Sequence, residues 1–367
     1  MRQWRERLAA AVAEHGTDRV TAFADGFVAY HIEVEVREGQ GSDVAQRIKG
    51  WETAFRTQGT WPDFPQSMVN QLHALDGVTS VVCEGPQSSL LIPLRMLTGI
   101  AGTSCEISTV LGTGSVSQAI DTCLGQWGIV AAGVHRLEGA DAPIEISIRE
   151  PGGEHQSVRL YPVSRKAYRS RLKQPAVLPD KLLCNRFNQG IATLARAVAA
   201  NGGVVSFRPR ELGRHDNIDD YVSLLASTHQ LVLSSRHRVM KQFARRAGIK
   251  TARGWPGSLA DLVDSSGKAL AQWLLGQMPQ EAIVAFVRYP GNEAAFFCDG
   301  LDPVAVAPPD GYGPESRAAR LQGALLGEVM VKEAVHRLCL DQSTWTAATH
   351  RILATAFQGT EARPWRY

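Results

Sequence analysis

The chain from residue 181 onward alternates short apolar runs with segments of helical spacing, and this alternation allows few folds. The runs "KLLCN", "VVSF" and "QLVLS" are followed in turn by "GIATLARAVAAN", "IDDYVSLLAS" and "RHRVMKQFARRAG". Strands that alternate with helices predict a doubly wound α/β fold, in which a parallel sheet carries helices on both faces. Ligands of such sheets bind beyond the carboxyl ends of the strands, so we expect the chemistry in the turns that follow strands.

The first half of the chain has patterns of a second, smaller sheet. The run "RVTAFA" is typical of a buried strand, and "AYHIEVEV" at 29–36 alternates apolar with polar residues, as a strand with one solvated face does. At 143–162 two alternating runs joined by Pro-Gly-Gly-Glu predict a hairpin. These segments predict a small β lid beside the main sheet, and residues 1–18 predict an amphipathic N-terminal helix.

Composition excludes several classes of protein. A chain of 367 residues with 44% hydrophobic content can bury a sizeable core. The net charge of +3, spread among interleaved acids and bases, indicates no nucleic-acid partner. We find no apolar run long enough to span a bilayer and no signal-peptide core, so we expect no membrane partner and a cytoplasmic location. The six cysteines form no CxxC pair, and we assign no residue to a metal. The oligomeric state is left open.

A Gly-x-Gly turn precedes the helix that begins near Ser115. Gly112, Thr113 and Gly114 allow a ligand to approach the backbone, and the N-terminus of a helix favours anions and polar oxygens. The alternative interpretation is a tight strand-to-helix turn that needs no ligand. Both interpretations stay open from the residues alone.

Basic residues follow two of the parallel strands. Arg208 and Arg210 lie around Glu211 after "VVSF", and Arg236 and Arg238 follow "QLVLS". At the carboxyl ends of strands these side chains could hold an anion. A solvated surface whose charges neutralise one another is the alternative.

The segment "DGYGPESR" at 310–317 is a third turn of interest, because it opens a long helical run. Gly311 and Gly313 permit a nest of backbone amides, and the following helix offers its positive end to an anion. Asp310 and Glu315 are the carboxylates at hand for proton abstraction. An acidic helix cap without any ligand is the alternative.

The order of these parts resembles the ribokinase-like (PfkB) sugar kinase superfamily. "VLGTGSVSQAIDTCLGQWG" is similar to the substrate turn and helix of that family, "IVAFVRYPGNEAAFFCDG" to its late strand pair, and "PPDGYGPESRAARLQGALLG" falls at its GxGD turn. The resemblance implies one α/β domain over 19–367 with a lid built from about 29–36 and 143–162. The late Gly turn and "PRELGR", with Glu211 as the matching glutamate, resemble the ADP-dependent glucokinase and phosphofructokinase branch.

The resemblance implies a set of site residues and cofactors. ADP or ATP would be the nucleotide, the other ligand would be a sugar-like or anionic small molecule, and Mg²⁺ is left open. The positions implied are, for the substrate, Asp25, Gly112, Thr113, Gly114 and Ser117; for catalysis, Asp310, Glu315 and Ser316; and for the anion or nucleotide, Arg208, Arg210, Glu211, Arg236, Arg238, Gly311 and Gly313.

Several of these positions lack the catalytic or magnesium-organising residue that the family has there. Ser316 stands where the family has its catalytic aspartate, and serine cannot act as that base. The family's magnesium-organising NxxE segment falls on 235–238, where Ser235 replaces the asparagine and Arg238 the glutamate. Loss of a general base alone typically costs ~10²–10⁴ in rate. We therefore expect arginines to bind an anion directly in place of magnesium.

Three functions are consistent with these residues. The first is a sugar-kinase-fold protein that binds a sugar-like or phosphorylated small molecule, with ordinary phosphoryl transfer weakened or lost. The second is an active ADP- or ATP-dependent carbohydrate kinase that uses Glu315 or Asp310 as the base. The third is a non-catalytic module that binds a partner protein through aromatic residues of the 51–65 loop and the C-terminal tail.

Overall fold

The computed structural model of this chain describes residues 20–88, 90–99, 103–151, 156–168, 175, 177–209, 217–235, 238–288, 293–307 and 341–358. The chain divides into two compact units. Unit 1 consists of Met1–Ala24, Ile92–Cys105 and Gln174–Glu361, and unit 2 of Asp25–Leu91, Glu106–Lys173 and Ala362–Tyr367. The helix expected over 1–18 and the turn and helix expected from residue 310 lie outside the described residues.

The larger sheet has nine strands in the described part of the chain, in the order β13-β12-β11-β10-β9-β8-β1-β4-β5. Its central strands β1, β8, β9, β10 and β11 pair in parallel, and β12 and β13 are added antiparallel beside β11. The strands are β1 (Val20–Asp25), β4 (Thr103–Gly112), β5 (Ile129–Leu137), β8 (Lys181–Cys184), β9 (Val204–Phe207), β10 (Gln230–Ser234), β11 (Ile283–Val287), β12 (Ala294–Cys298) and β13 (Val304–Val306).

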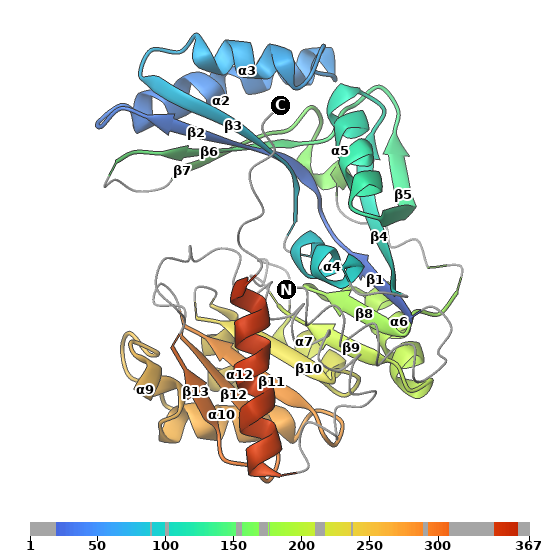
Figure 1. Ribbon diagram of the computed structural model, residues 1–367, viewed down its shortest axis with the longest axis vertical. Coiled ribbons are helices and arrows are strands. Elements are labelled where there is room, and N and C mark those ends of the chain that lie inside the picture. Colours follow the sequence, from blue (N-terminus) through green and yellow to red (C-terminus); the bar gives the residue numbers. More distant parts are fainter. Residues whose placement is uncertain are drawn as a thin grey trace. The chain divides into compact units, whose positions relative to one another are not determined.

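Helices connect the parallel strands of unit 1 in the alternation that the sequence predicts, which confirms the α/β class. Every residue of β8, β9 and β11 is buried, as expected for a parallel sheet that helices cover on both faces. None of the described helices is both long and apolar enough to cross a membrane. The helices of this unit are α4 (Leu91–Thr98), α6 (Gln189–Ala200), α7 (Ile218–Leu225), α8 (Val239–Arg246), α9 (Leu259–Leu262), α10 (Ser265–Leu275) and α12 (Gln342–Gln358) (Figure 1).

The second sheet lies in unit 2 and has four strands, in the order β3-β2-β6-β7. β2 and β6 are parallel, and the other two pairs are antiparallel. Helices α2 and α3 run along one face of this sheet (Figure 1), where Tyr30, Ile32 and Val34 are buried. The elements are β2 (Ala29–Val36), β3 (Val78–Gln87), β6 (Ile144–Arg149), β7 (Gln156–Leu160), α2 (Gly41–Gln58), α3 (Gln66–His73) and α5 (Ser115–Gln126).

The segments 29–36 and 143–162, which the sequence assigns to a small sheet, form β2, β6 and β7. The third partner, β3, was not among the strands that the sequence indicated, because its ten residues "VTSVVCEGPQ" include a glycine and a proline and lack clean alternation. The role of this sheet as a lid stays a prediction.

Candidate functional site

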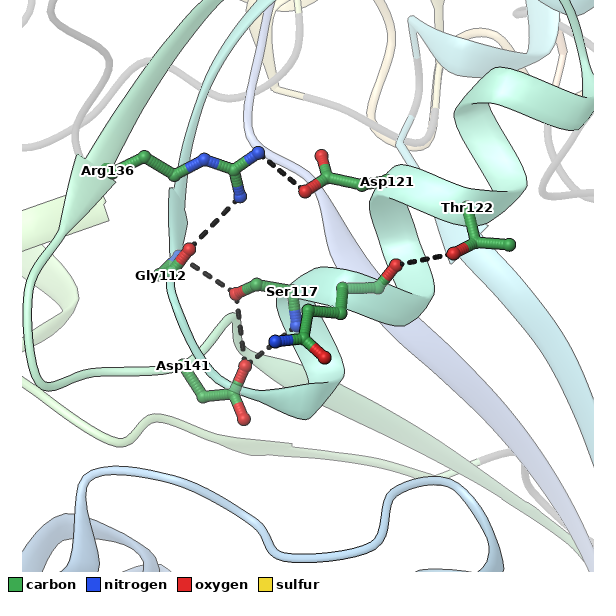
Figure 2. A network of polar contacts seen from close by, with 7 residues as sticks. Gly112, Ser117, Asp121, Thr122, Arg136 and Asp141 are labelled. Carbon is green, nitrogen blue, oxygen red and sulfur yellow. Dashed lines mark hydrogen bonds and ion pairs between the residues drawn. The ribbon is translucent and has the colours of Figure 1, made fainter.

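The carboxylate of Asp141, from the same unit, binds the start of the helix that follows the Gly-x-Gly turn. β4 ends at Gly112 and α5 begins at Ser115, and the Asp141 side chain lies against the first turn of this helix (Figure 2). Asp141 Oδ2 accepts the backbone N–H of Val116 (3.1 Å), and Oδ1 accepts that of Ser117 (2.7 Å). Asp141 is fully buried. The side chain therefore caps α5 from 24 or more residues along the chain, and its charge lies at the positive end of the helix.

The hydroxyl of Ser117 completes this closure. Ser117 Oγ donates to Asp141 Oδ1 (3.0 Å) and accepts the N–H of Gly112 (2.9 Å), and Ser117 has no exposed surface. The N–H of Thr113 donates to Ala140 O (2.9 Å). Four of the five residues expected to bind substrate, all except Asp25, thus lie together, and partners within the protein form hydrogen bonds with Gly112, Thr113 and Ser117.

Both glycines of the turn are required by close packing. A Cβ atom on Gly112 would lie 1.9 Å from Ala140 O, and one on Gly114 would lie 2.4 Å from Asp141 Oδ2. No side chain fits at either position, whether or not a ligand binds there. The substrate role of this turn stays a prediction.

Arg136 on β5 links the turn to the body of α5. Its guanidinium donates to Gly112 O (3.1 Å) and to Asp121 Oδ2 on the helix (2.5 Å) (Figure 2). Neither Asp141 nor Arg136 was a sequence candidate. Each acts across a gap of about 15 to 25 residues, so no local pattern marks it.

The carboxyl ends of the parallel strands in unit 1 gather polar residues at one edge of the sheet. The N–H of Arg208, directly after β9, donates to Cys184 O at the end of β8 (2.9 Å), and the N–H of Ser235, after β10, donates to Val287 O at the end of β11 (2.8 Å). Arg208 is only 5% exposed. Arg238 is the N-cap residue of α8 and is exposed.

The remaining sequence candidates divide into two groups. Asp25 is the last residue of β1 and is buried. The others lie outside the described residues, so their predicted roles remain predictions: Arg210, Glu211, Arg236, Asp310, Gly311, Gly313, Glu315 and Ser316.

Arg288, which follows β11, organises a loop beside this edge. It binds Glu293 through two hydrogen bonds (2.6 and 2.7 Å) and donates to Gly257 O (3.1 Å). Hydrogen bonds from the amides of Gly257 and Ser258 lower the pKa of Asp261 below its ordinary value. A pocket of about 250 Å³ adjoins this loop, and its lining residues are Ala252, Arg253, Gly254, Trp255, Gly257, Asp261, Asp264 and Ser266.

The face of the small sheet opposite to α2 and α3 carries an interlocked set of ionisable side chains. His31 Nδ1 lies 2.7 Å from Glu84 Oε2, and His31 Nε2 lies 2.7 Å from Ser147 Oγ. The pairs Arg149–Glu33 (3.0 Å) and Arg159–Glu145 (2.9 Å) flank them. The alternation of 29–36 predicted a polar face, but the sequence did not single out any of these residues.

The pKa values of Glu33 and Glu84 shift in opposite directions. Burial raises the pKa of Glu33, the charge of Arg149 opposes the rise, and the neighbouring Glu84 adds to it. Burial also acts to raise the pKa of Glu84, but the contacts with His31, together with Glu33 and Arg149, outweigh it, so that pKa lies below its ordinary value. Glu84 is therefore the more acidic of the two carboxyl groups.

The fold of this chain is the ribokinase-like fold, as comparison with solved structures shows. Similar structures include fructokinase from Xylella fastidiosa with bound ATP (11% identity, 92% of each chain covered, TM-score 0.56) and ribokinase from Cryptococcus neoformans in complex with ADP (10%, 92% of each chain, 0.57). Adenosine kinase from Schistosoma mansoni in complex with adenosine is also similar (9%, 91% of this chain and 93% of that chain, 0.58).

These structures are ribokinase/PfkB-type sugar and nucleoside kinases. No family model matches the sequence, and no curated protein matches it significantly. At sequence identities of about 10%, this similarity establishes the fold but not the activity.

Proposed function

We propose that this protein binds a sugar-like or phosphorylated small molecule at the carboxyl edge of the large sheet, with ordinary phosphoryl transfer weakened or lost. The observation that carries the proposal is the position of Arg208 and Arg238, which follow the neighbouring parallel strands β9 and β10. Ligands of doubly wound sheets bind at this edge. Two of the similar structures hold ATP or ADP, which supports an anionic or nucleotide ligand.

The start of α8 supports an anion at this edge. Arg238 occupies the N-cap position without any side-chain hydrogen bond to the helix, whereas Asn188 and Asn217 cap α6 and α7 with theirs. A cation at the N-terminus of a helix opposes the helix dipole. A bound phosphate or carboxylate would remove this conflict, because it interacts favourably with both the arginine and the helix end.

Arginine is the proposed partner of the anion at this strand end, in place of magnesium. Ser235 and Arg238 stand where the resembled family has magnesium-organising residues. Within the part of the chain that the structure describes, no three His, Cys, Asp or Glu side chains gather closely enough to hold a metal ion. The proposal therefore uses arginine in place of a metal as the partner of the anion.

Thermal unfolding of the full chain with inorganic phosphate, ADP, ATP and sugar phosphates, each with and without Mg²⁺, tests the proposal. An anion that binds the folded state at 100 times its Kd adds about 2.7 kcal/mol and raises the Tm. We expect a rise without Mg²⁺ that Arg238→Glu removes. Arg245→Glu, at the exposed far end of the same helix, is the matched control and should keep the rise.

Two other outcomes would replace the proposal. A rise that needs both nucleotide and Mg²⁺, together with phosphoryl transfer to a sugar, would identify an active carbohydrate kinase using Glu315 or Asp310 as the base. The absence of any response to these ligands would favour the partner-binding module.

A further inference from the structure

Ser147, His31 and Glu84 form an arrangement that differs from the anion site, because all three lie on the small sheet of unit 2. They come from three adjacent strands: Glu84 from β3, His31 from β2 and Ser147 from β6. Both contacts of the imidazole are 2.7 Å long. A hydroxyl, an imidazole and a carboxylate in this order and at these distances are the parts of an activated serine nucleophile.

A β-bulge brings the carboxylate to the imidazole. The pairing register of β2 with β3 shifts between His31, which pairs with Gly85, and Ile32, which pairs with Cys83, so Glu84 is the extra residue. Gly85 has φ +84°, a left-handed conformation that favours glycine. Bulges re-aim side chains and occur often beside active sites. In β3 the bulge allows Cys83 to be buried while Glu84 contacts His31.

The partners of His31 determine which of its ring nitrogens carries the hydrogen. The pKa of Glu84 lies below its ordinary value, so this side chain is a carboxylate at neutral pH. A carboxylate can only accept, so Nδ1 of His31 carries the hydrogen toward Glu84. In the neutral ring Nε2 is then an acceptor, and the Ser147 hydroxyl donates to it. This is the tautomer in which imidazole acts as a general base.

We propose that Ser147 is a nucleophile that takes an acyl group from a small activated ester, with His31 as general base and Glu84 as the positioning residue. The bond from Ser147 Oγ to the acyl carbon forms, and the ester C–O bond breaks. The hydroxyl proton moves to His31 Nε2 and from there to the leaving alcohol. Water then adds to the acyl-serine through the same base, which releases the carboxylic acid and restores the serine.

Burial of the hydroxyl and the imidazole limits the substrate to small molecules. Ser147 is 3% exposed and His31 is 8% exposed, so access to Oγ is narrow. Arg149, two residues along β6, has 57% of its side chain exposed and pairs with Glu33. Because Arg149 lies on the same face of the strand as Ser147, its guanidinium would stabilise a negative charge that develops at Ser147.

Labelling of the full chain with a small fluorophosphonate, mapped by mass spectrometry, tests the inference. We expect one label, on Ser147, and none in Ser147→Ala. His31→Gln should slow the labelling at least about 100-fold. Ser157→Ala is the matched control: Ser157 is the register partner of Ser147 on β7, but its hydroxyl donates to Glu145 and has no imidazole partner, so this variant should label at the wild-type rate.

If a variant fails to fold, labelling of the wild-type protein with and without denaturant still tests whether Ser147 is the nucleophile. Only the folded chain brings His31 to Ser147, so labelling should stop in denaturant. A folded chain that leaves Ser147 unlabelled, a rate that His31→Gln does not change, or labelling that persists in denaturant would each overturn the inference. The proposed anion site is independent of these results, because it lies in unit 1.

Discussion

Asp141 Oδ1 accepts two hydrogen bonds from Ser117, one from its backbone N–H at 2.7 Å and one from its hydroxyl at 3.0 Å (Figure 2). Through this pair a carboxylate from the 137–144 connection takes the place that an external anion would have at the start of α5. The same carboxylate accepts the N–H groups of Val116 and Ala142. The geometry of the Gly-x-Gly turn therefore depends on one buried side chain.

Removal of that carboxylate should destabilise unit 2. In Asp141→Ala several buried donors lose their acceptor, and we expect the free energy of unfolding to fall by about 3 kcal/mol. Denaturant unfolding measures this change. Asp43→Ala is the matched control, because Asp43 is an exposed acid in the first turn of α2, and it should cost less than about 1 kcal/mol. Equal effects of the two substitutions would show that the cap contributes nothing particular.

The first glycine of the turn should tolerate no side chain. In Gly112→Ala the new Cβ would lie 1.9 Å from Ala140 O, so the backbone must shift and we expect a loss of several kcal/mol or failure to fold. Gly125→Ala, in the same helix that follows the turn, meets no atom within 4 Å and should be neutral or stabilising by up to about 1 kcal/mol. Thermal unfolding of both variants compares them; a stable Gly112→Ala protein would contradict the packing described.

Glu33→Gln should change the pH dependence of stability. The folded-state pKa of Glu33 is raised, so its contribution is fully present below the unfolded pKa and is lost as pH rises through the folded pKa. The variant cannot ionise, and its stability relative to wild type should therefore increase from pH 4 toward neutral pH, by an amount on the order of 1 kcal/mol or less. Glu35→Gln, exposed two residues along β2, is the control. Urea unfolding across this pH range measures the difference in stability between the variant and wild type. A difference that does not change with pH would contradict the raised pKa of Glu33.

Cys83 and Cys105 should resist thiol reagents in the folded protein. Burial raises the pKa of Cys83 to about 11, although the hydrogen bond with Tyr30 opposes the rise, and burial raises that of Cys105 to about 12. The thiolate is the reactive form, so both should stay unmodified at pH 8 and react once denaturant exposes them. Alkylation followed by peptide mapping identifies each cysteine. Rapid modification of Cys105 in the native state would show that its strand end opens.

The fold followed largely from local patterns in the sequence. The alternation after residue 181 predicted β8, α6, β9, α7, β10 and α8, because each element buries an apolar face whose period is visible in a short window. The same reasoning found β2 with its bounds, since its eight residues alternate cleanly. It missed β3, whose bulge at Glu84 and Gly85 interrupts the period.

The candidate sites followed from the sequence only in part. Gly112 and Gly114 were recognised as a turn, but the Asp141 that closes it was not, because nothing near residue 141 marks it as a partner of α5. His31 and Ser147 are 116 residues apart in the sequence, and their contact depends on the parallel pairing of β2 with β6.

The sequence by itself therefore determined the α/β class and the buried faces of its strands. It also determined which chemical groups a position lacks: Ser316 cannot supply a carboxylate in any fold. The tertiary structure decided which side chains meet. Periodicity reports the face that a segment buries, whereas contacts between distant residues depend on sheet order, register and bulges. Asp141 beside Ser117, and Glu84 beside His31, are consequences of that topology.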